Sequence, residues 1–284
     1  MSSAGDAVQV VAGAGVDVYL GHTRFTKPSA VVVDGRELRF DKAVIATGSR
    51  PAAPAIEGLR EGEYLSNETV FSLTELPKRL LVLGGGPLGC ELAQAFRRLG
   101  SDVDLVHSSN NLLPKDEPEA GELLSRQFER DGIRLHFEFK AVGAANRRLT
   151  AHGRTGTRQF EYDALLMGIG RRANIEDLGL EAAQIRVKDG GVETDAYLRT
   201  SNPAVYAAGD VAFPEKYTHV AMATARLCIA NALNGANRRA HDLIIPHCTY
   251  TDPEVASVGW TSLRAAEEGI GVNLTSEYVI FPRK

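Results

Sequence analysis

The feature that most constrains the fold is an apolar run that leads into a glycine-rich turn and then a helix, at residues 80–91. Gly84, Gly86 and Gly89 match the pattern G-x-G-x-x-G. In this pattern the first glycine permits a tight turn, the second lets a pyrophosphate approach the backbone, and the third allows helix and strand to pack closely. The helix N-terminus adds N–H groups and a partial positive charge. The stretch therefore predicts a dinucleotide-binding loop.

The flanking sequence favours this interpretation over a simple glycine turn. Pro87 suits the first turn of a helix, where its missing N–H would have no intrahelical partner. Apolar residues then recur at helical spacing as far as Gly100, a residue type that commonly ends helices in a left-handed conformation. A second apolar strand at residues 103–106 completes most of a βαβ unit. The apolar helix positions are Leu88, Leu92, Ala95, Phe96 and Leu99.

The residue after the second strand commonly separates NAD from NADP, because a carboxylate bonds the ribose hydroxyls and an arginine meets the 2′-phosphate. This chain has His107 there, followed by Ser108, Ser109 and Asn110. A neutral histidine could bond the ribose, whereas a protonated one could meet the phosphate. A third interpretation is that His107 only ends the strand. The sequence leaves these alternatives open.

Composition excludes several classes of protein. The 284 residues are enough for about two domains, and 44% hydrophobic with 24% charged residues is typical of globular proteins. A net charge of −4 gives no basic excess for nucleic acid. No apolar run is long enough to span a membrane, and the N-terminus has no signal-peptide pattern, so we expect a cytoplasmic protein without nucleic-acid or membrane partners.

The three cysteines, Cys90, Cys228 and Cys248, form neither a disulfide framework nor a close pair. Cys90 and Cys228 are expected to be packing residues in helices. A second group of residues could suggest a metal, but its spacing matches no pattern of ligands, so no metal site is predicted. That group comprises His241, His247, Cys248 and Asp252.

The rest of the chain alternates between strands and helices. Short β segments are expected at residues 16–25 and 29–46, with a hairpin turn at residues 34–35, and residues 51–54 read as a connection between domains. A helix at 118–130, strands at 133–137 and 163–167, and an antiparallel excursion at 146–161 follow. Residues 168–172 end a strand where open α/β sheets bind ligands. Asp210 follows a small-residue strand and fits equally a ligand-binding carboxylate and a turn or cap residue.

Four motifs in this order resemble the pyridine nucleotide-disulfide oxidoreductases, the flavoproteins that include mercuric reductase, dihydrolipoamide dehydrogenase and glutathione reductase. The motifs lie at residues 46–51, 84–91, 168–174 and 207–210, and the resemblance runs from about residue 10 to the C-terminus. The central helix looks closest to mercuric-reductase-like members. The resemblance implies FAD and NAD or NADP as cofactors.

The resemblance also implies roles for individual residues. Thr47, Gly48 and Ser49 would border FAD, and Asp210 would bond the ribityl chain. Glu91 would lie near the nicotinamide and pair with a lysine beside the flavin. The segment that would lie along the flavin is Lys216, Tyr217, Thr218 and His219, and the nicotinamide cofactor would be lined by Gly84, Gly85, Gly86, Pro87, Leu88, Gly89, Glu91, His107 and Gly170.

Two features of the family are missing from this sequence: a first G-x-G-x-x-G strand for FAD and a C-x-x-x-x-C redox pair. The acid and base expected near the end of the dimerisation domain are also missing, so no catalytic residue is predicted. We therefore expect an α/β protein truncated at both ends, with a Rossmann-like NAD(P)-binding domain inserted in an incomplete FAD-binding domain. The expected domains are a first FAD segment at 1–77, the NAD(P)-binding domain at 78–198, a second FAD segment at 199–245 and a partial dimerisation domain at 246–284.

Two functions from different classes follow. The first is a NAD(P)H-dependent flavoprotein oxidoreductase, in which hydride passes from NAD(P)H to FAD and on to a disulfide or metal-ion acceptor in the complete protein. The second is a non-catalytic NAD(P)-binding module or degraded remnant. The resemblance implies a homodimer only if the dimerisation domain is complete.

Overall fold

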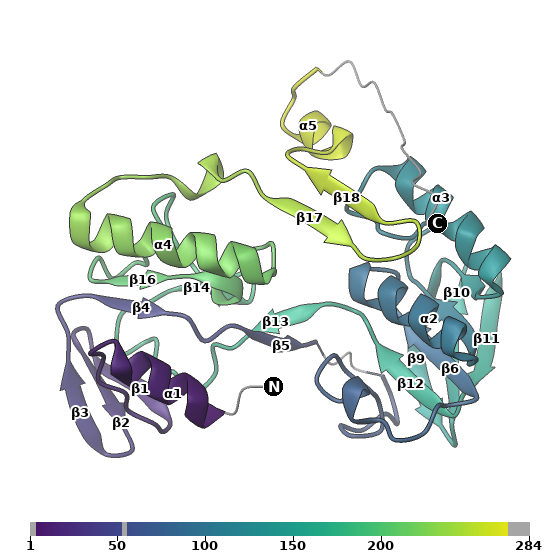
Figure 1. The fold of residues 1–284 in the computed structure, drawn as a ribbon, viewed down its shortest axis with the longest axis horizontal. Coiled ribbons are helices and arrows are strands. Elements are labelled where there is room, and N and C mark those ends of the chain that lie inside the picture. Colours follow the sequence, from purple (N-terminus) through teal and green to yellow (C-terminus); the bar gives the residue numbers. More distant parts are fainter. Residues whose placement is uncertain (1–3, 53–55, 272–284) are drawn as a thin grey trace. The chain divides into compact units, whose positions relative to one another are not determined.

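The computed structural model describes residues 4–52 and 56–271 and divides the chain into two compact units (Figure 1). Unit 1 comprises residues 1–50 and 172–243, and unit 2 comprises residues 51–171 and 244–284. The chain passes from one unit to the other through β5 (Ser49–Pro51) and β13 (Arg171–Ala173), which pair with each other.

Unit 2 is built on a four-stranded parallel sheet. Its strand order is β12 (Ala164–Met167), β6 (Arg79–Leu83), β7 (Asp102–Val106) and β8 (Arg134–His136). Helix α2 (Pro87–Leu99) connects β6 to β7, and α3 (Pro118–Asp131) connects β7 to β8. Parallel neighbours need such crossover connections, which explains the alternation of strand and helix in the sequence.

Each strand of this sheet contributes to two different cores, because alternate side chains point to opposite faces. Leu80 and Val82 of β6 pack with the buried faces of α2 and α3. Leu81 and Leu83 pack on the other face, against a three-stranded antiparallel sheet of β9 (Phe139–Ala145), β10 (Arg148–Gly153) and β11 (Gly156–Glu161). The parallel sheet is thus covered on both sides, as parallel sheets in α/β proteins are.

The helices of unit 2 begin and end where the sequence places the signals. Pro87 and Pro118 open α2 and α3, and Gly100 and Gly132 end them in the left-handed conformation, with φ of 111° and 84°. The expected helices at 88–99 and 118–130, the strands at 103–106 and 163–167 and the antiparallel excursion are therefore confirmed. A short 3₁₀ turn, η1 (Val70–Ser72), precedes β6.

The C-terminal segment of unit 2 contains a hairpin of β17 (Pro246–Thr249) and β18 (Val255–Val258), followed by α5 (Ser262–Glu267). Gln94 of α2 holds the hairpin turn with two bonds to Asp252: its Oε1 accepts from the backbone N–H at 2.7 Å, and its Nε2 donates to the carbonyl at 2.8 Å. His247 Nε2 lies 2.7 Å from the buried carboxylate of Asp116. These contacts fix the hairpin on the helical face of unit 2.

Unit 1 contains a three-stranded meander, a short parallel pair of strands and a small hairpin. The meander consists of β1 (Thr23–Lys27), β2 (Ala30–Val33) and β3 (Arg36–Arg39), and β4 (Ala43–Ile45) pairs in parallel with β16 (Val205–Ala207). A small hairpin joins β14 (Val187–Lys188) and β15 (Gly191–Val192). The helical elements are α1 (Ala4–Gly13), the 3₁₀ turns η2 (Gly209–Val211) and η3 (Ala240–Asp242), and α4 (Thr218–Asn234).

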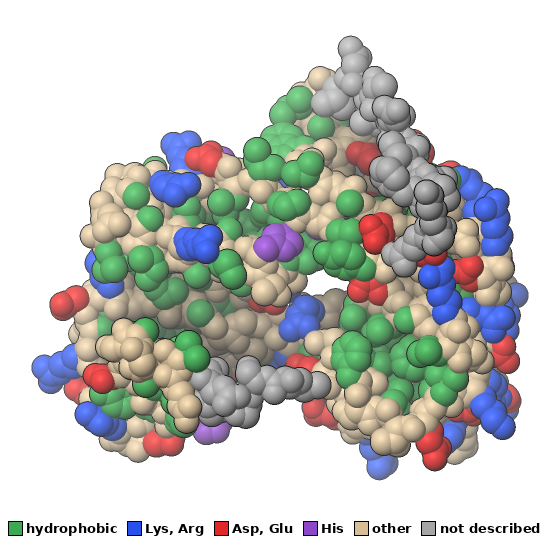
Figure 2. Space-filling model, viewed as in Figure 1, with side chains coloured by type: hydrophobic (Ala, Val, Ile, Leu, Met, Phe, Trp, Pro, Cys, Tyr) green, Lys and Arg blue, Asp and Glu red, His purple; other side chains and the backbone are tan. Residues whose placement is uncertain are grey.

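Strand β16 separates the two cores of unit 1. Val205 and Ala207 pack with Phe25 and Ile45 on one side, and Tyr206 packs with Leu227 of α4 on the other. The opposite side of α4 is also apolar: Met222, Ile229 and Leu233 are at least half exposed. Figure 2 shows hydrophobic side chains on the surface over this helix. An apolar helix face of this kind can pack against a further protein segment.

The expected β structure at residues 16–25 is wrong for most of its length. Strand β1 begins only at Thr23, and residues 16–20 have no regular structure. Their β-branched and aromatic side chains favour strands, but Val16 and Leu20 are 53% and 74% exposed and have no apolar face to cover. The sequence analysis also missed α1. Among residues 4–52 and 56–271, no helix combines the length and apolar character needed to cross a bilayer.

Asp104 links β7 to β8 and gives unit 2 a predictable acid sensitivity. Its carboxylate accepts hydrogen bonds from Arg134 at 2.9 and 2.7 Å and lies 2.7 Å from His136 Nε2. Burial alone would raise the pKa of Asp104, but the hydrogen bonds from His136 and Arg134 outweigh burial and lower that pKa from 3.8 to about 2. Because the pKa is lower in the folded state, the stabilisation is present above pH 3.8 and is lost as pH falls towards 2.

We therefore expect Asp104→Asn to lower the free energy of unfolding by about 2 kcal/mol at pH 7. The difference from the wild type should shrink as the pH falls from 4 to 2, and urea unfolding at a series of pH values measures it. Asp102→Asn is the matched control, because Asp102 lies on the same strand with its side chain 64% exposed. A D104N deficit that does not change with pH would contradict this assignment.

Candidate functional site

The three glycines of the loop after β6 have three different structural reasons to be glycine. Gly84 has φ of 108°, and a Cβ there would lie 2.3 Å from the Gly168 carbonyl oxygen. A Cβ on Gly89 would lie 1.9 Å from the Gly84 carbonyl oxygen, so α2 packs directly on the end of β6. At Gly86 a Cβ would meet nothing within 4 Å. The space beside Gly86 is open, as the approach of a pyrophosphate to the backbone requires.

Gly85 lies against a second wall of the loop, formed by residues 107–113. A Cβ at Gly85 would lie 2.8 Å from His107 Cδ2 and 2.9 Å from Leu112 Cδ2. The Leu113 N–H donates to the Gly85 carbonyl at 2.8 Å. His107 is thus brought to the glycine loop, as its position after β7 indicated. Its Nε2 is enclosed and has no hydrogen-bond partner among the described residues.

The other loop residues build the frame of this site. Pro87 occupies the first turn of α2, and Leu88 packs against the core beneath the helix. Gly170, with φ of 110°, lies beyond the carboxyl end of β12, two residues after the Gly168 carbonyl that Gly84 approaches. Ala52 donates to the Gly170 carbonyl at 3.0 Å. The structure therefore places Gly170 at the same sheet edge as the glycine loop.

Glu91 has a structural partner in unit 2. Its Oε1 accepts a hydrogen bond of 2.9 Å from the Tyr250 backbone N–H, at the end of β17. Cys90, next to it, is fully buried and donates from Sγ to the Gly85 carbonyl at 3.4 Å. Burial raises the pKa of the Cys90 thiol above its usual range, which keeps it protonated and unreactive. Cys90 is a packing residue, as expected.

In unit 1, residues 47–49 lead from β4 into β5, and Asn174 holds this segment in place. Thr47 Oγ1 donates to the Asn174 carbonyl at 2.7 Å, and Asn174 Nδ2 donates back to the Thr47 carbonyl at 2.9 Å. The Asn174 backbone N–H donates to the Gly48 carbonyl at 2.9 Å, and Arg50 Nη1 donates to Asn174 Oδ1 at 2.6 Å. Gly48 has φ of 69°, which glycine tolerates best.

Asp210 of η2 is brought to the segment 47–49. Ser49 Oγ donates to Asp210 Oδ2 at 2.5 Å, although the two residues are 161 positions apart in the chain. Lys216 Nζ donates to the carbonyls of Asp210 at 2.6 Å and Phe213 at 3.3 Å, which closes the turn after η2. The carboxylate of Asp210 thus lies beside Ser49, at the end of the segment 47–49.

The segment after Lys216 leads into α4. Tyr217 is the residue before the helix, and its ring stacks on that of His219, with centroids 5.4 Å apart and planes at 10°. Thr218 is the first residue of α4 and is exposed. Thr224, one and a half turns further on, accepts a 2.9 Å hydrogen bond from the Gly209 N–H. This bond sets the start of α4 beside the turn that carries Asp210.

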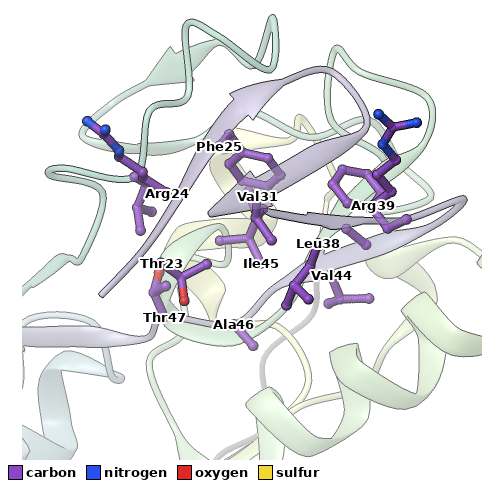
Figure 3. Close-up of a pocket in the computed structure, with 13 residues that line it drawn as sticks. Thr23, Arg24, Phe25, Val31, Leu38, Arg39, Val44, Ile45, Ala46 and Thr47 are labelled. Atoms are coloured by element: carbon purple, nitrogen blue, oxygen red, sulfur yellow. The ribbon is translucent and has the colours of Figure 1, made fainter. Parts of the chain in front are cut away.

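A cavity of about 360 Å³ lies elsewhere in unit 1, between the meander and β4 (Figure 3). Phe25, Val31 and Ile45 gather at its centre, whereas the guanidinium groups of Arg24 and Arg39 point away. This cavity reaches the residues considered for nucleotide binding only at Thr47.

Two residues of this arrangement carry no clear signal in the sequence. Asn174 lies in the motif at residues 168–174, and in the structure it takes part in three hydrogen bonds with Thr47 and Gly48 and accepts a fourth from Arg50. Thr224 gave no signal, because a threonine within a helix is unremarkable until its partner is known. Among residues 4–52 and 56–271, no group of three His, Cys, Asp or Glu side chains is arranged to hold a metal ion.

Comparison with known proteins identifies the family. A family model described as pyridine nucleotide-disulphide oxidoreductase matches residues 1–226. The chain belongs to this family, as its motifs indicated, and proteins of the family use FAD and NAD(P)H.

Individual relatives agree with this assignment. A mercuric reductase from Lysinibacillus sphaericus is 35% identical over 266 residues, covering 90% of this chain and 48% of the relative. A dihydrolipoyl dehydrogenase from Thermus scotoductus is 35% identical over 279 residues, covering 95% and 60%. The HOCl-induced flavoprotein disulfide reductase RclA from Escherichia coli superposes with a TM-score of 0.82 at 25% identity, covering 93% of this chain and 62% of that chain. The chain thus spans about half to three fifths of the length of these proteins.

The glycine geometry predicts different effects of the same substitution at two positions. Gly89→Ala places a methyl group against the backbone oxygen of Gly84, which cannot move without distorting β6, and should destabilise unit 2 by about 2–3 kcal/mol. Gly86→Ala enters open space and should cost under about 1 kcal/mol, since Gly86 is only the N-cap of α2. Thermal or urea unfolding measures both. Equal losses for the two variants would contradict the close packing of α2 on β6.

Proposed function

We propose that this chain forms the NAD(P)H-binding domain and adjoining flavin-binding segments of a flavoprotein oxidoreductase. In the complete protein, hydride passes from NAD(P)H to FAD and then to a disulfide or metal-ion acceptor. The sequence places the NAD(P)-binding domain at residues 78–198, but residues 172–198 belong to unit 1, so we assign residues 78–171 to that domain. Residues 1–50 and 172–243 contribute to the flavin side, and residues 246–284 belong to a dimerisation domain that supports a homodimer when complete.

The observation that carries this proposal is the division of roles among Gly84, Gly86 and Gly89. Two of them permit close backbone contacts that a Cβ would block, and the third leaves open space beside the helix N-terminus. A simple turn needs no glycine at a position with open space and a φ of −81°, because any residue adopts that conformation. The N–H groups at the start of α2 are then available to a pyrophosphate.

On the flavin side, the groups that would hold FAD are those around the segment 47–49. Ser49 and Lys216 orient Asp210 and its turn, so that the carboxylate can accept hydrogen bonds from ligand hydroxyls. Tyr217 and His219 present a stacked pair of rings at the start of α4. Together they support a role for residues 47–49, 210 and 216–219 in binding the flavin.

A second candidate function is a non-catalytic NAD(P)-binding module. Burial raises the pKa of Cys90 beyond its usual range and that of Cys228 to about 12, so these two thiols stay protonated at neutral pH under either function. Flavin absorbance that NADH or NADPH bleaches would support the oxidoreductase, whereas colourless protein that still binds the dinucleotide would support the module.

We expect Gly86→Val to abolish NAD(P)H binding and leave the fold intact. A Cβ at this position meets nothing within 4 Å, and the branches of a valine extend from it into the space that the pyrophosphate needs. Fluorescence titration with NADH and NADPH measures affinity, and circular dichroism checks the fold. Gly13→Val is the matched control, because Gly13 also lies in open space and is in α1 of unit 1. Unchanged affinity of the G86V variant would refute the site.

A further inference from the structure

The sequence left open whether the loop takes NADH or NADPH, and the surroundings of His107 bear on this choice. We infer that His107 selects NADH over NADPH by presenting a neutral imidazole to the adenosine ribose in a loop that has no cation for a 2′-phosphate. This inference rests on the proposed function, because it concerns the dinucleotide bound by the same glycine loop.

The position of His107 is fixed by its backbone. Its N–H donates to the His136 carbonyl at 2.9 Å, and its own carbonyl accepts from the Phe139 N–H at 3.0 Å. The ring lies against Gly85, where an added Cβ would come within 2.8 Å of Cδ2. The end of the second strand in such a fold is where the ribose hydroxyls, or the 2′-phosphate, are recognised. His107 is therefore part of the ribose wall and is held there on both sides.

The packing of the ring disfavours its charged form. His107 Nε2 is enclosed and has no acceptor among the described residues. A protonated imidazole carries an N–H on both nitrogens, so it would bury a charged donor without a partner, which is costly. Burial also lowers the pKa of His107 below its ordinary value of 6.5. The ring that meets the ribose at neutral pH is thus uncharged, and Nδ1 is left to exchange a hydrogen bond with a ribose hydroxyl.

The two loop segments beside the ring contain no cation, and Arg158, which lies 3.2 Å from His136 Nδ1 and over the Phe139 ring, is engaged there. Residues 84–90 and residues 107–113 contain no Lys or Arg. On the neighbouring segment, Glu138 donates its backbone N–H to the Ser109 carbonyl at 3.1 Å, and its carboxylate pairs with Arg154 at 3.3 Å. Arg134 is engaged by Asp104 on the strand itself. A 2′-phosphate, with nearly two negative charges, would lose water here without gaining a charged partner.

The test is a comparison of dissociation constants for NADH and NADPH, measured by calorimetry with the full 284-residue chain at pH 7.5. We expect NADH to bind at least about tenfold more tightly than NADPH. His107→Arg should move this ratio towards NADPH by about tenfold or more. Ser108→Arg should act in the same direction, and it adds the cation at an exposed position without disturbing the packed ring.

His22→Arg is the matched control, since it makes the same substitution at an exposed position of unit 1 and should leave the ratio unchanged. Three results would each overturn the inference and leave the proposed function standing. The wild type could bind the two dinucleotides equally, it could bind NADPH more tightly, or neither H107R nor S108R could change the ratio of the two dissociation constants. If neither dinucleotide binds the wild-type chain, the proposed function fails, and this inference fails with it.

Discussion

The structure of unit 2 depends on the approach of α2 to the end of β6, where Gly89 lies so close to the Gly84 carbonyl that no side chain fits between them. This contact aims the N-terminus of α2 at the carboxyl edge of the sheet. It also sets the path of the loop, so that Gly85 packs between His107 and Leu112 and accepts a hydrogen bond from Leu113. The binding surface is a consequence of backbone packing, which explains why it needs glycines more than particular functional side chains.

The same sheet holds this loop rigid from both sides. Leu80 and Val82 are buried against the helices, and Leu81 and Leu83 are buried against the antiparallel sheet. A strand anchored on both faces cannot slip by one residue without exchanging its two cores, which fixes the register. The loops at its carboxyl end therefore have defined positions, as a site that recognises a ligand through backbone groups requires.

Unit 1 achieves comparable order around residues 47–49 by a different means, namely hydrogen bonds between distant segments. Thr47 and Asn174 are 127 positions apart in the chain, and Ser49 and Asp210 are 161 apart. Short strands and turns have little regular backbone pairing of their own, so side-chain bonds such as those of Asn174 hold them. The family motifs pointed to Thr47, Gly48, Ser49 and Asp210 individually, but only the folded chain shows that Asn174 and Thr224 tie them together.

The sequence by itself determined the elements whose signals are local: the glycine loop, the prolines and glycines that bound α2 and α3, and the alternation of strand and helix that requires a parallel sheet. It misjudged residues 16–22, because β propensity is expressed only where a face can be buried. Tertiary structure alone decided the environment of His107. Whether a histidine is charged depends on the surroundings of its ring. The ring of His107 packs against Gly85, and its backbone is held by His136 and Phe139, residues distant from it in the chain. A motif can therefore place a residue in a site, but the charge that the residue carries is set by its neighbours in space.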